Sequence, residues 1–320
     1  MSDEETRVEE LWFSNDTLVI RAEKKLFRVS KALLAARSSA FKDMIAFPQP
    51  ASGAIEPLDG SPVVTLHDAA ADVEVLLKAI FDSSYFMPAP EPVALQDLLG
   101  ILRLSDKYDI QYLQRRALNH LSTGFYYSTV HDYRTYVQES RDHVSYPSAL
   151  SFCSVVDAAT AVGALWLLPV AYYKGSSFGR DALLAATQSG VPETIVQKLI
   201  LANAGLASMT LGACDFLCSR SGAACQTHDT CDSGRYGILS RVVLAVNSVT
   251  RLLPLDRFGE KSWGLLRQRI CASCCAAAQE RRTCSLEALW DRLPSMYGLP
   301  PWPELHAMRA AAIGDIDSAA

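Results

Sequence analysis

The N-terminal part of the chain mixes short β-prone runs with apolar residues at helical spacing. Runs at 17–21 and 25–29 flank Ala22-Glu23-Lys24, which predicts a β-hairpin, and a third strand is predicted at 62–66. Two short helices are predicted to follow the hairpin, with Ser38 capping the second of them. This region therefore alternates between the two kinds of secondary structure.

Helical spacing dominates after the third strand. Asp68 or Asp72 can cap a helix over 73–81, and two more helices are predicted around 95–104 and 110–121. Because the strands are gathered early and the helices late, the order predicts an α+β domain rather than a doubly wound sheet.

From residue 125 onward the β pattern fades, and the sequence predicts an irregular all-α domain. Its long apolar-periodic segments lie at 149–173, 192–206, 236–253 and 263–278. We accordingly divide the chain into an acidic tail at 1–10, a mixed domain at 11–124, a linker helix at 125–148 and a helical C-terminal domain at 149–320.

Composition narrows the classes of function. Among 320 residues, 49 % are hydrophobic and 20 % are charged, which is typical of globular domains. The net charge of -5 argues against binding nucleic acid through bulk charge. No secretory signal is predicted at the acidic N-terminus, and the apolar stretch 158–173 is interrupted by Gly163 and Pro169. We expect a cytoplasmic or nuclear protein that does not cross a membrane.

A long string, Leu33-Leu34-Ala35-Ala36-Arg37-Ser38-Ser39-Ala40-Phe41-Lys42-Asp43-Met44, follows the predicted hairpin. Further segments lie at 11–13, 16–20, 26–29, 63–68, 77–82 and 102–110. Together they resemble a BTB/POZ domain, in the form abundant in mushroom-forming fungi, over residues 8–124. The segments 290–294 and 298–305 resemble the tail that accompanies such domains, which implies no known activity.

The BTB resemblance implies a protein-interaction module rather than an enzyme. Its partners would be a second copy of this chain, another BTB protein or a cullin scaffold. The chain would then be a substrate adaptor of a cullin ubiquitin ligase or a dimerising part of a transcriptional regulator. The adaptor is favoured because no zinc-finger array is present, although the segment 85–91 does not supply a clean hydrophobic-x-Glu motif of cullin-binding domains.

The resemblance also suggests interaction residues. The positions of Asp16 and Arg37 lie near the dimer interface of BTB domains, where a charge pair can be partly buried. The alternative is a surface Arg37 that pairs locally with Asp43. Phe86 and Met87 are assigned to the same interaction surface. Where the family often has a His after the hairpin, this chain has Ser30, which can still cap a helix.

Eight of the nine cysteines lie beyond residue 210, and four of them form a candidate metal site. Cys271 and Cys274 have the C-x2-C spacing that lets two thiolates bind one tetrahedral zinc. Cys225 and Cys231 lie in a polar segment about forty residues earlier and would complete a structural zinc site. The alternative is that cysteines such as Cys214, Cys218, Cys274 and Cys275 are ordinary buried apolar side chains.

Two weaker patterns favour ordinary structure. Residues 175–179 match G-x-S-x-G, but Ser177 follows a predicted helix rather than a strand, so a loop between helices is favoured over a hydrolase. Residues 234–292 hold ten Lys/Arg against five Asp/Glu. A basic face there would comprise Arg267, Arg269, Arg281 and Arg282. Without a recognition helix or interleaved aromatic residues, solvated helix faces are favoured over nucleic-acid binding.

Overall fold

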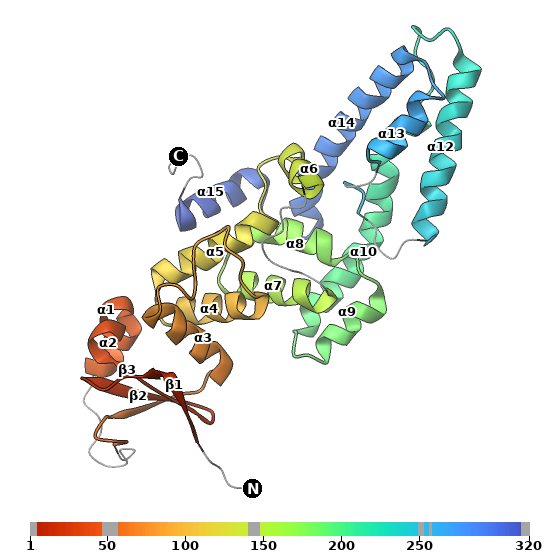
Figure 1. The fold of residues 1–320 in the computed structure, drawn as a ribbon. Helices are drawn as coiled ribbons and strands as arrows, with labels where there is room; N and C mark the ends of the chain where they lie inside the picture. Colours follow the sequence, from red (N-terminus) through yellow and green to blue (C-terminus); the bar gives the residue numbers. More distant parts are fainter. Residues whose placement is uncertain (1–4, 47–56, 140–147, 249–252, 256–257, 315–320) are drawn as a thin grey trace. The chain divides into compact units, whose positions relative to one another are not determined.

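The computed structural model describes residues 5–46, 57–139, 148–248, 253–255 and 258–314. The chain divides into two compact units, and the boundary between them falls after Gly124 (Figure 1).

The N-terminal unit is built on a four-stranded mixed sheet of order β1-β3-β2-β4. Its strands are β1 (Thr6–Trp12), β2 (Thr17–Ala22), β3 (Lys25–Ser30) and β4 (Val63–Leu66). The antiparallel pair β2–β3 confirms the predicted hairpin, while β1 runs parallel to β3 and β4 runs parallel to β2.

The predicted acidic tail is partly wrong, because residues 6–10 belong to β1. This strand lies at an edge of the sheet, and Leu11 is its one buried residue. An edge strand that is exposed on most of its surface tolerates charged residues. β1 therefore lacks the apolar run from which a strand could have been predicted.

The described part of the N-terminal unit also contains five helices, of which α1 and α2 lie beside the sheet (Figure 1). They are α1 (Lys31–Arg37), α2 (Ser39–Ala46), α3 (Ala70–Phe81), α4 (Leu95–Lys107) and α5 (Gln111–Phe125). Phe27 from the sheet, Phe41 from α2 and Leu98 from α4 are all fully buried. Sheet and helices therefore each contribute to a buried apolar core, as expected for an α+β domain.

Ser38 caps α2 as predicted. Its hydroxyl oxygen accepts a hydrogen bond from the Phe41 backbone N–H at 3.0 Å and donates one to the Tyr108 carbonyl at 2.5 Å. Ser30 likewise caps α1, because its side chain accepts from the Leu33 N–H. Both short helices thus have a side-chain partner for an N-terminal amide that would otherwise be unsatisfied.

The capping prediction for α3 is wrong. Neither Asp68 nor Asp72 caps the helix; the Glu23 carboxylate, from the hairpin turn, accepts the Ala70 N–H at 3.2 Å. Asp72 lies in the first turn and pairs instead with Arg103 of α4 at 2.8 Å. A cap supplied from 47 residues away leaves no local sequence pattern.

The described part of the C-terminal unit is helical, as predicted. It comprises α6 (Val130–Glu139), α7 (Ala149–Ala161), the short 3-10 helix η1 (Leu165–Leu167), α8 (Leu168–Gly175), α9 (Arg180–Thr187), α10 (Glu193–Ala213), α11 (Asp215–Cys218), α12 (His228–Ser248), α13 (Glu260–Arg267), α14 (Ala272–Met296) and α15 (Trp302–Ile313). The apolar segments at 149–173 and 263–278 each contain more than one helix, so their continuity was overestimated.

The helix predicted as a linker, α6, packs into the C-terminal unit. Its Tyr133 is fully buried, and the ring lies 6.0 Å from that of Tyr173 and 5.7 Å from that of Trp290. Burial of a large aromatic side chain makes α6 part of this unit's core. The interpretation of residues 125–148 as a linker is therefore corrected for α6; residues 140–147 lie outside the described part.

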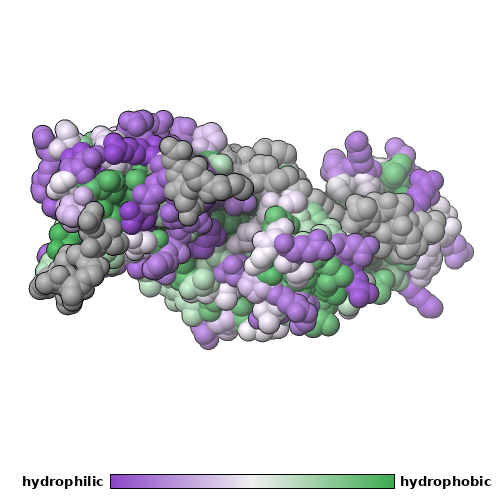
Figure 2. All heavy atoms as spheres, turned by 90° about the horizontal axis from the view of Figure 1, so that it is seen from below, coloured by the Kyte–Doolittle hydropathy of each residue, from purple (hydrophilic) through white to green (hydrophobic). Residues whose placement is uncertain are grey.

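One described helix, α10, is long and apolar enough to span a bilayer by length and composition. Core helices of soluble proteins meet the same criterion, and α10 packs against α9 and α14. Leu201 and Leu211 nevertheless point outward, with exposures of 75 % and 67 %. On the face shown in Figure 2, hydrophobic residues form separate patches among hydrophilic ones.

Candidate functional site

Four cysteine sulfurs converge in the C-terminal unit. The Sγ atoms of Cys225, Cys231, Cys271 and Cys274 all lie within 4.8 Å of one another. Cys225, Cys231 and Cys274 are buried, and Cys271 is partly exposed. These are the four residues that the sequence singled out as candidate ligands, and the structure brings all of them together.

Two helix starts position three of the four sulfurs. Cys231 lies in the first turn of α12, and Cys271 occupies the N-cap position of α14, with Cys274 one turn later. Cys225 comes from the segment between α11 and α12. The Cys271 backbone N–H donates to the Cys231 sulfur at 3.2 Å, so the start of α14 is held directly against α12.

A polar clamp holds the segment before α12 next to the cysteines. The Asp232 carboxylate accepts hydrogen bonds from the Ser221 backbone N–H at 2.9 Å and from its hydroxyl at 2.6 Å. The buried Arg235 guanidinium pairs with Asp232 and donates to the Ser221 hydroxyl at 2.9 Å. Charge-assisted bonds of this kind fix the path of the segment.

The thiols influence one another's ionisation. Burial opposes ionisation of Cys225, but the Thr227 backbone N–H and the thiols of Cys274 and Cys231 together lower the pKa of Cys225 to about 6. Burial and the nearby Cys225 raise the pKa of Cys274 to about 12. A cluster of thiolates this close repels itself unless a cation is shared.

Gly234 allows α12 to approach the segment before α14. A Cβ at this position would lie 2.6 Å from the Arg269 carbonyl oxygen and 2.9 Å from the Arg269 Cβ. We expect Gly234→Ala to lower the free energy of unfolding by about 1–3 kcal/mol, as overpacking does. Chemical denaturation of the full chain measures this.

Gly264→Ala in α13 is the matched control, because a Cβ there meets nothing within 4 Å. Alanine is the better helix former by about 1 kcal/mol, so this variant should be slightly more stable than the parent. Equal stabilisation by both substitutions would contradict the close approach at Gly234.

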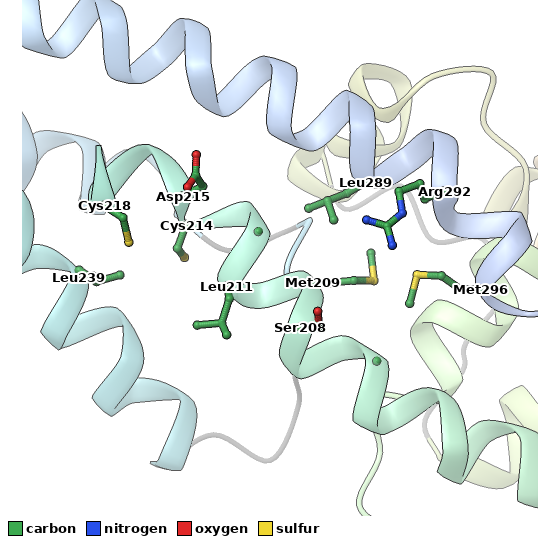
Figure 3. Close-up of a pocket in the computed structure, with 12 residues that line it drawn as sticks. Ser208, Met209, Leu211, Cys214, Asp215, Cys218, Leu239, Leu289, Arg292 and Met296 are labelled. Carbon is green, nitrogen blue, oxygen red and sulfur yellow. The ribbon is translucent and has the colours of Figure 1, made fainter. Parts of the chain in front are cut away.

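An apolar groove of about 730 Å³ runs along α10 (Figure 3). Figure 3 shows Met209 of α10 facing Leu289 and Met296 of α14, with Arg292 beside them. Leu239 of α12 lines the other end of the groove, together with Cys214 at the start of α11 and Cys218 at its end. Methionines adapt to irregular apolar surfaces, which suits this groove to a protein side chain or helix.

Cys214 and Cys218 line this groove and do not belong to the four-cysteine group. Cys214 is buried, whereas Cys218 is exposed. The interpretation as an ordinary buried apolar side chain therefore fits Cys214, and it does not fit the exposed Cys218. Cys275, next to Cys274, is partly exposed and also lies outside the group.

The G-x-S-x-G pattern does not form a nucleophile elbow. Ser177 is buried and follows the C-terminal end of α8, and its hydroxyl donates to the Lys174 carbonyl at 2.6 Å. A nucleophile elbow instead exposes its serine between a strand and a helix. The loop interpretation of this segment agrees with the structure.

The basic residues at 234–292 do not share one surface role. Arg267 pairs with Glu260, and Arg281 lies 3.8 Å from Asp215. Arg282 is buried and donates to the Ala213 carbonyl at 3.2 Å. These contacts favour structural roles over phosphate binding.

In the N-terminal unit, Asp16 and Arg37 do not pair among the described contacts. Asp16, with a positive φ of 42°, forms an ion pair with Lys31 at 3.7 Å. The exposed Arg37 places its guanidinium 5.4 Å from the centre of the Tyr112 ring. Among the residues that the structure describes, Arg37 forms no ion pair with Asp43, and the location of Asp16 and Arg37 at a dimer interface stays a prediction.

Phe86 is a core residue, which corrects its assignment to an interaction surface. It is 2 % exposed, and its ring stacks on that of His120 at 5.2 Å. The next residue, Met87, is 45 % exposed, while its carbonyl lies 2.8 Å from the His120 Nε2. The contacts of His120 thus hold the backbone at Phe86 and Met87. Of these two residues, only Met87 exposes its side chain to solvent.

A hollow of about 420 Å³ lies where the end of β1 meets the end of α3. Within the described part of this unit, the exposed large hydrophobic residues are Phe13, Tyr85 and Met87, and the first two line the hollow. The Phe13 ring lies 5.3 Å from that of Phe81, and Lys78 reaches Glu10 at 2.8 Å across the same hollow. We call this site the aromatic hollow, because Phe13, Phe81 and Tyr85 line it together with charged residues, and aromatic residues are enriched at protein interfaces.

Comparison with known families decides what this unit is. Residues 8–124 match the family model described as BTB/POZ domain. The N-terminal unit is a BTB/POZ domain. No curated protein and no solved structure matches the chain. The resemblance of the long string at 33–44 to a BTB/POZ domain is thereby confirmed, and the family match ends at Gly124, as the N-terminal unit does.

Sequence reasoning missed part of the BTB surface. Tyr85 was noted only as the start of a segment lacking a cullin-type motif, and Phe13 only as part of the resemblance. Their proximity depends on β1 joining the sheet edge beside α3, which local patterns do not indicate. Phe13 directly follows β1, and this strand is the feature that could have located the hollow.

Proposed function

We propose that this chain is an adaptor-like scaffold whose BTB domain binds the N-terminal domain of a cullin through the aromatic hollow. The general role is that of the BTB domain, a protein–protein interaction module. The observation that carries the proposal is that Phe13 and Tyr85 are exposed together at one hollow of this domain. The proposal requires a cytoplasmic or nuclear protein.

The chemistry of the hollow supports a protein partner. Aromatic residues at the centre of an interface carry most of the binding energy, and charged residues at the rim contribute mainly to orientation. The Tyr85 ring is held in place, because its hydroxyl donates to Asp97 at 3.1 Å and Lys78 lies 5.9 Å from the ring centre. A side chain already fixed in position loses little entropy on binding.

The C-terminal unit supports the adaptor role by offering a separate surface. The groove along α10 and its exposed Leu211 are apolar features of this unit alone. An adaptor needs one surface for the ligase scaffold and another for its substrate. The buried Ser177, bonded to the Lys174 carbonyl, gives no support to the rival hydrolase function.

Calorimetry of the full chain with a cullin N-terminal domain tests this proposal, and Tyr85→Ala is the decisive variant. Truncating a hot-spot aromatic residue typically costs more than 2 kcal/mol, so we expect Kd to rise at least about tenfold. Tyr236→Ala, which removes a comparably exposed tyrosine from α12 in the other unit, should leave Kd unchanged.

The outcomes separate the adaptor from a dimerising scaffold. No measurable heat from folded proteins would overturn the cullin proposal. Light scattering of the same samples would then identify a homodimer, whose dissociation by Tyr85→Ala would assign the hollow to self-association. Binding that is unaffected by Tyr85→Ala would show that a cullin binds elsewhere.

A further inference from the structure

We propose that Cys225, Cys231, Cys271 and Cys274 bind one zinc ion as a structural centre of the C-terminal unit. The inference is independent of the cullin proposal, because it concerns residues of a different unit. It rests first on geometry. Four sulfurs about 2.3 Å from a tetrahedral zinc lie about 3.8 Å apart, and the Sγ atoms of Cys225 and Cys271 are 3.9 Å apart.

The ligand set favours zinc in a structural role. Four thiolates around a tetrahedral ion leave no open position for water or substrate, which distinguishes structural from catalytic sites. Thiolate sulfur is a soft donor and excludes magnesium and calcium as occupants. On binding, each thiol gives its proton to solvent and its sulfur donates an electron pair to zinc, with no change of oxidation state.

Neighbouring groups support metal-bound sulfur. The Cys231 sulfur receives the Cys271 backbone N–H at 3.2 Å and lies 3.3 Å from the Thr227 hydroxyl. Hydrogen bonds to a ligand atom orient it and stabilise its charge. One backbone N–H and one side-chain hydroxyl thus surround the Cys231 sulfur at the start of α12.

Packing alone does not explain the convergence. The cysteines lie at a core formed with the aromatic rings of Phe216, Phe258 and Trp263. Buried thiols that serve only as apolar side chains have no reason to direct four sulfurs toward one point. Cys275 lies outside the group although it adjoins Cys274, which makes it a close control.

The centre would join segments that are distant in sequence. Cys225 precedes α12 and Cys274 lies in the first turn of α14, so one ion closes the chain across α12 and α13. The groove along α10 takes Leu239 from α12 and Leu289 from α14. Zinc would therefore fix the two helices that form walls of this groove, since structural zinc contributes its binding energy to folding.

Metal analysis of the full chain, purified under reducing conditions, tests the inference. We expect one zinc per chain by mass spectrometry of the metal, and one zinc again after chelation and reconstitution. Cys271→Ser should lose the metal, whereas Cys275→Ser should retain one zinc. Replacement by cobalt should give the visible absorption of tetrahedral thiolate coordination, and this spectrum should be absent from Cys271→Ser.

A measurement on the unmodified chain guards against variants that fail to fold. Alkylation followed by peptide mass spectrometry should find the four cysteines protected with zinc and reactive after chelation. Cys218 and Cys284, which are exposed, should react in both states. No zinc before or after reconstitution, a coloured iron–sulfur cluster, or disulfides among these cysteines under reducing conditions would each overturn the inference.

Discussion

Replacing Phe41 with alanine should lower the free energy of unfolding of the BTB domain by about 3–5 kcal/mol, the usual cost of removing a buried aromatic side chain. Phe41 is fully buried in α2, and its ring stacks on that of Tyr108 with centroids 4.6 Å apart. Ser38 ties the same two residues together through its bonds to the Phe41 N–H and the Tyr108 carbonyl. The cavity would therefore form where α2 is anchored.

Denaturant unfolding of the full chain measures the effect, and hydrogen exchange locates it. Exchange should increase in α2 and at the end of α4, because the Phe41 and Tyr108 rings join these two elements. Phe41→Leu retains most of the apolar volume and should cost clearly less than the alanine variant. A loss below about 1 kcal/mol for Phe41→Ala would contradict the packing of α2, because it is less than such cavities cost.

The sequence predicted secondary structure correctly where the local pattern agrees with the fold. The string at 33–44 places a capping serine three residues before a buried aromatic, and the structure uses both as predicted. The hairpin was predictable for the same reason, because β-prone runs and the turn between them are adjacent in the chain. The structure of a segment can be predicted when its local signals agree with one another in this way.

Features that depend on distant partners were not predictable. The cap of α3 comes from Glu23, 47 residues before the helix starts, and three of the seven residues of β1 are charged. For the α3 cap and for β1, the partner is chosen by how elements pack together, and one sequence carries little information on that.

The cysteine cluster was predictable in part. The C-x2-C pair at Cys271 and Cys274 is local, because one helical turn brings both sulfurs to the same side. The pairing with Cys225 and Cys231 was inferred from composition, and its geometry depends on the contact of α12 with the segment before α14. Gly234 permits that contact, yet a glycine within a helix gives no indication of which backbone it faces.

Replacing Trp302 with alanine should destabilise the C-terminal unit by about 3–5 kcal/mol, again the cost of removing a large buried aromatic residue. The turn at Gly298, with a φ of 68°, ends α14 and is followed by α15, which starts at Trp302. There the Trp302 ring stacks on that of Trp290 at 4.8 Å, and its Nε1–H donates to the Trp290 carbonyl at 2.8 Å. This pairing gives the tail segments at 290–294 and 298–305 a physical role.

Trp302→Phe separates stacking from hydrogen bonding, since it keeps an aromatic ring and removes the donor. We expect its stability to fall between those of the parent and Trp302→Ala when unfolding is followed by circular dichroism. The Trp302→Ala variant should also increase hydrogen exchange in α15, because the ring is the buried anchor at the start of that helix. Unchanged exchange in α15 would mean that contacts other than the tryptophan pair hold this helix in place.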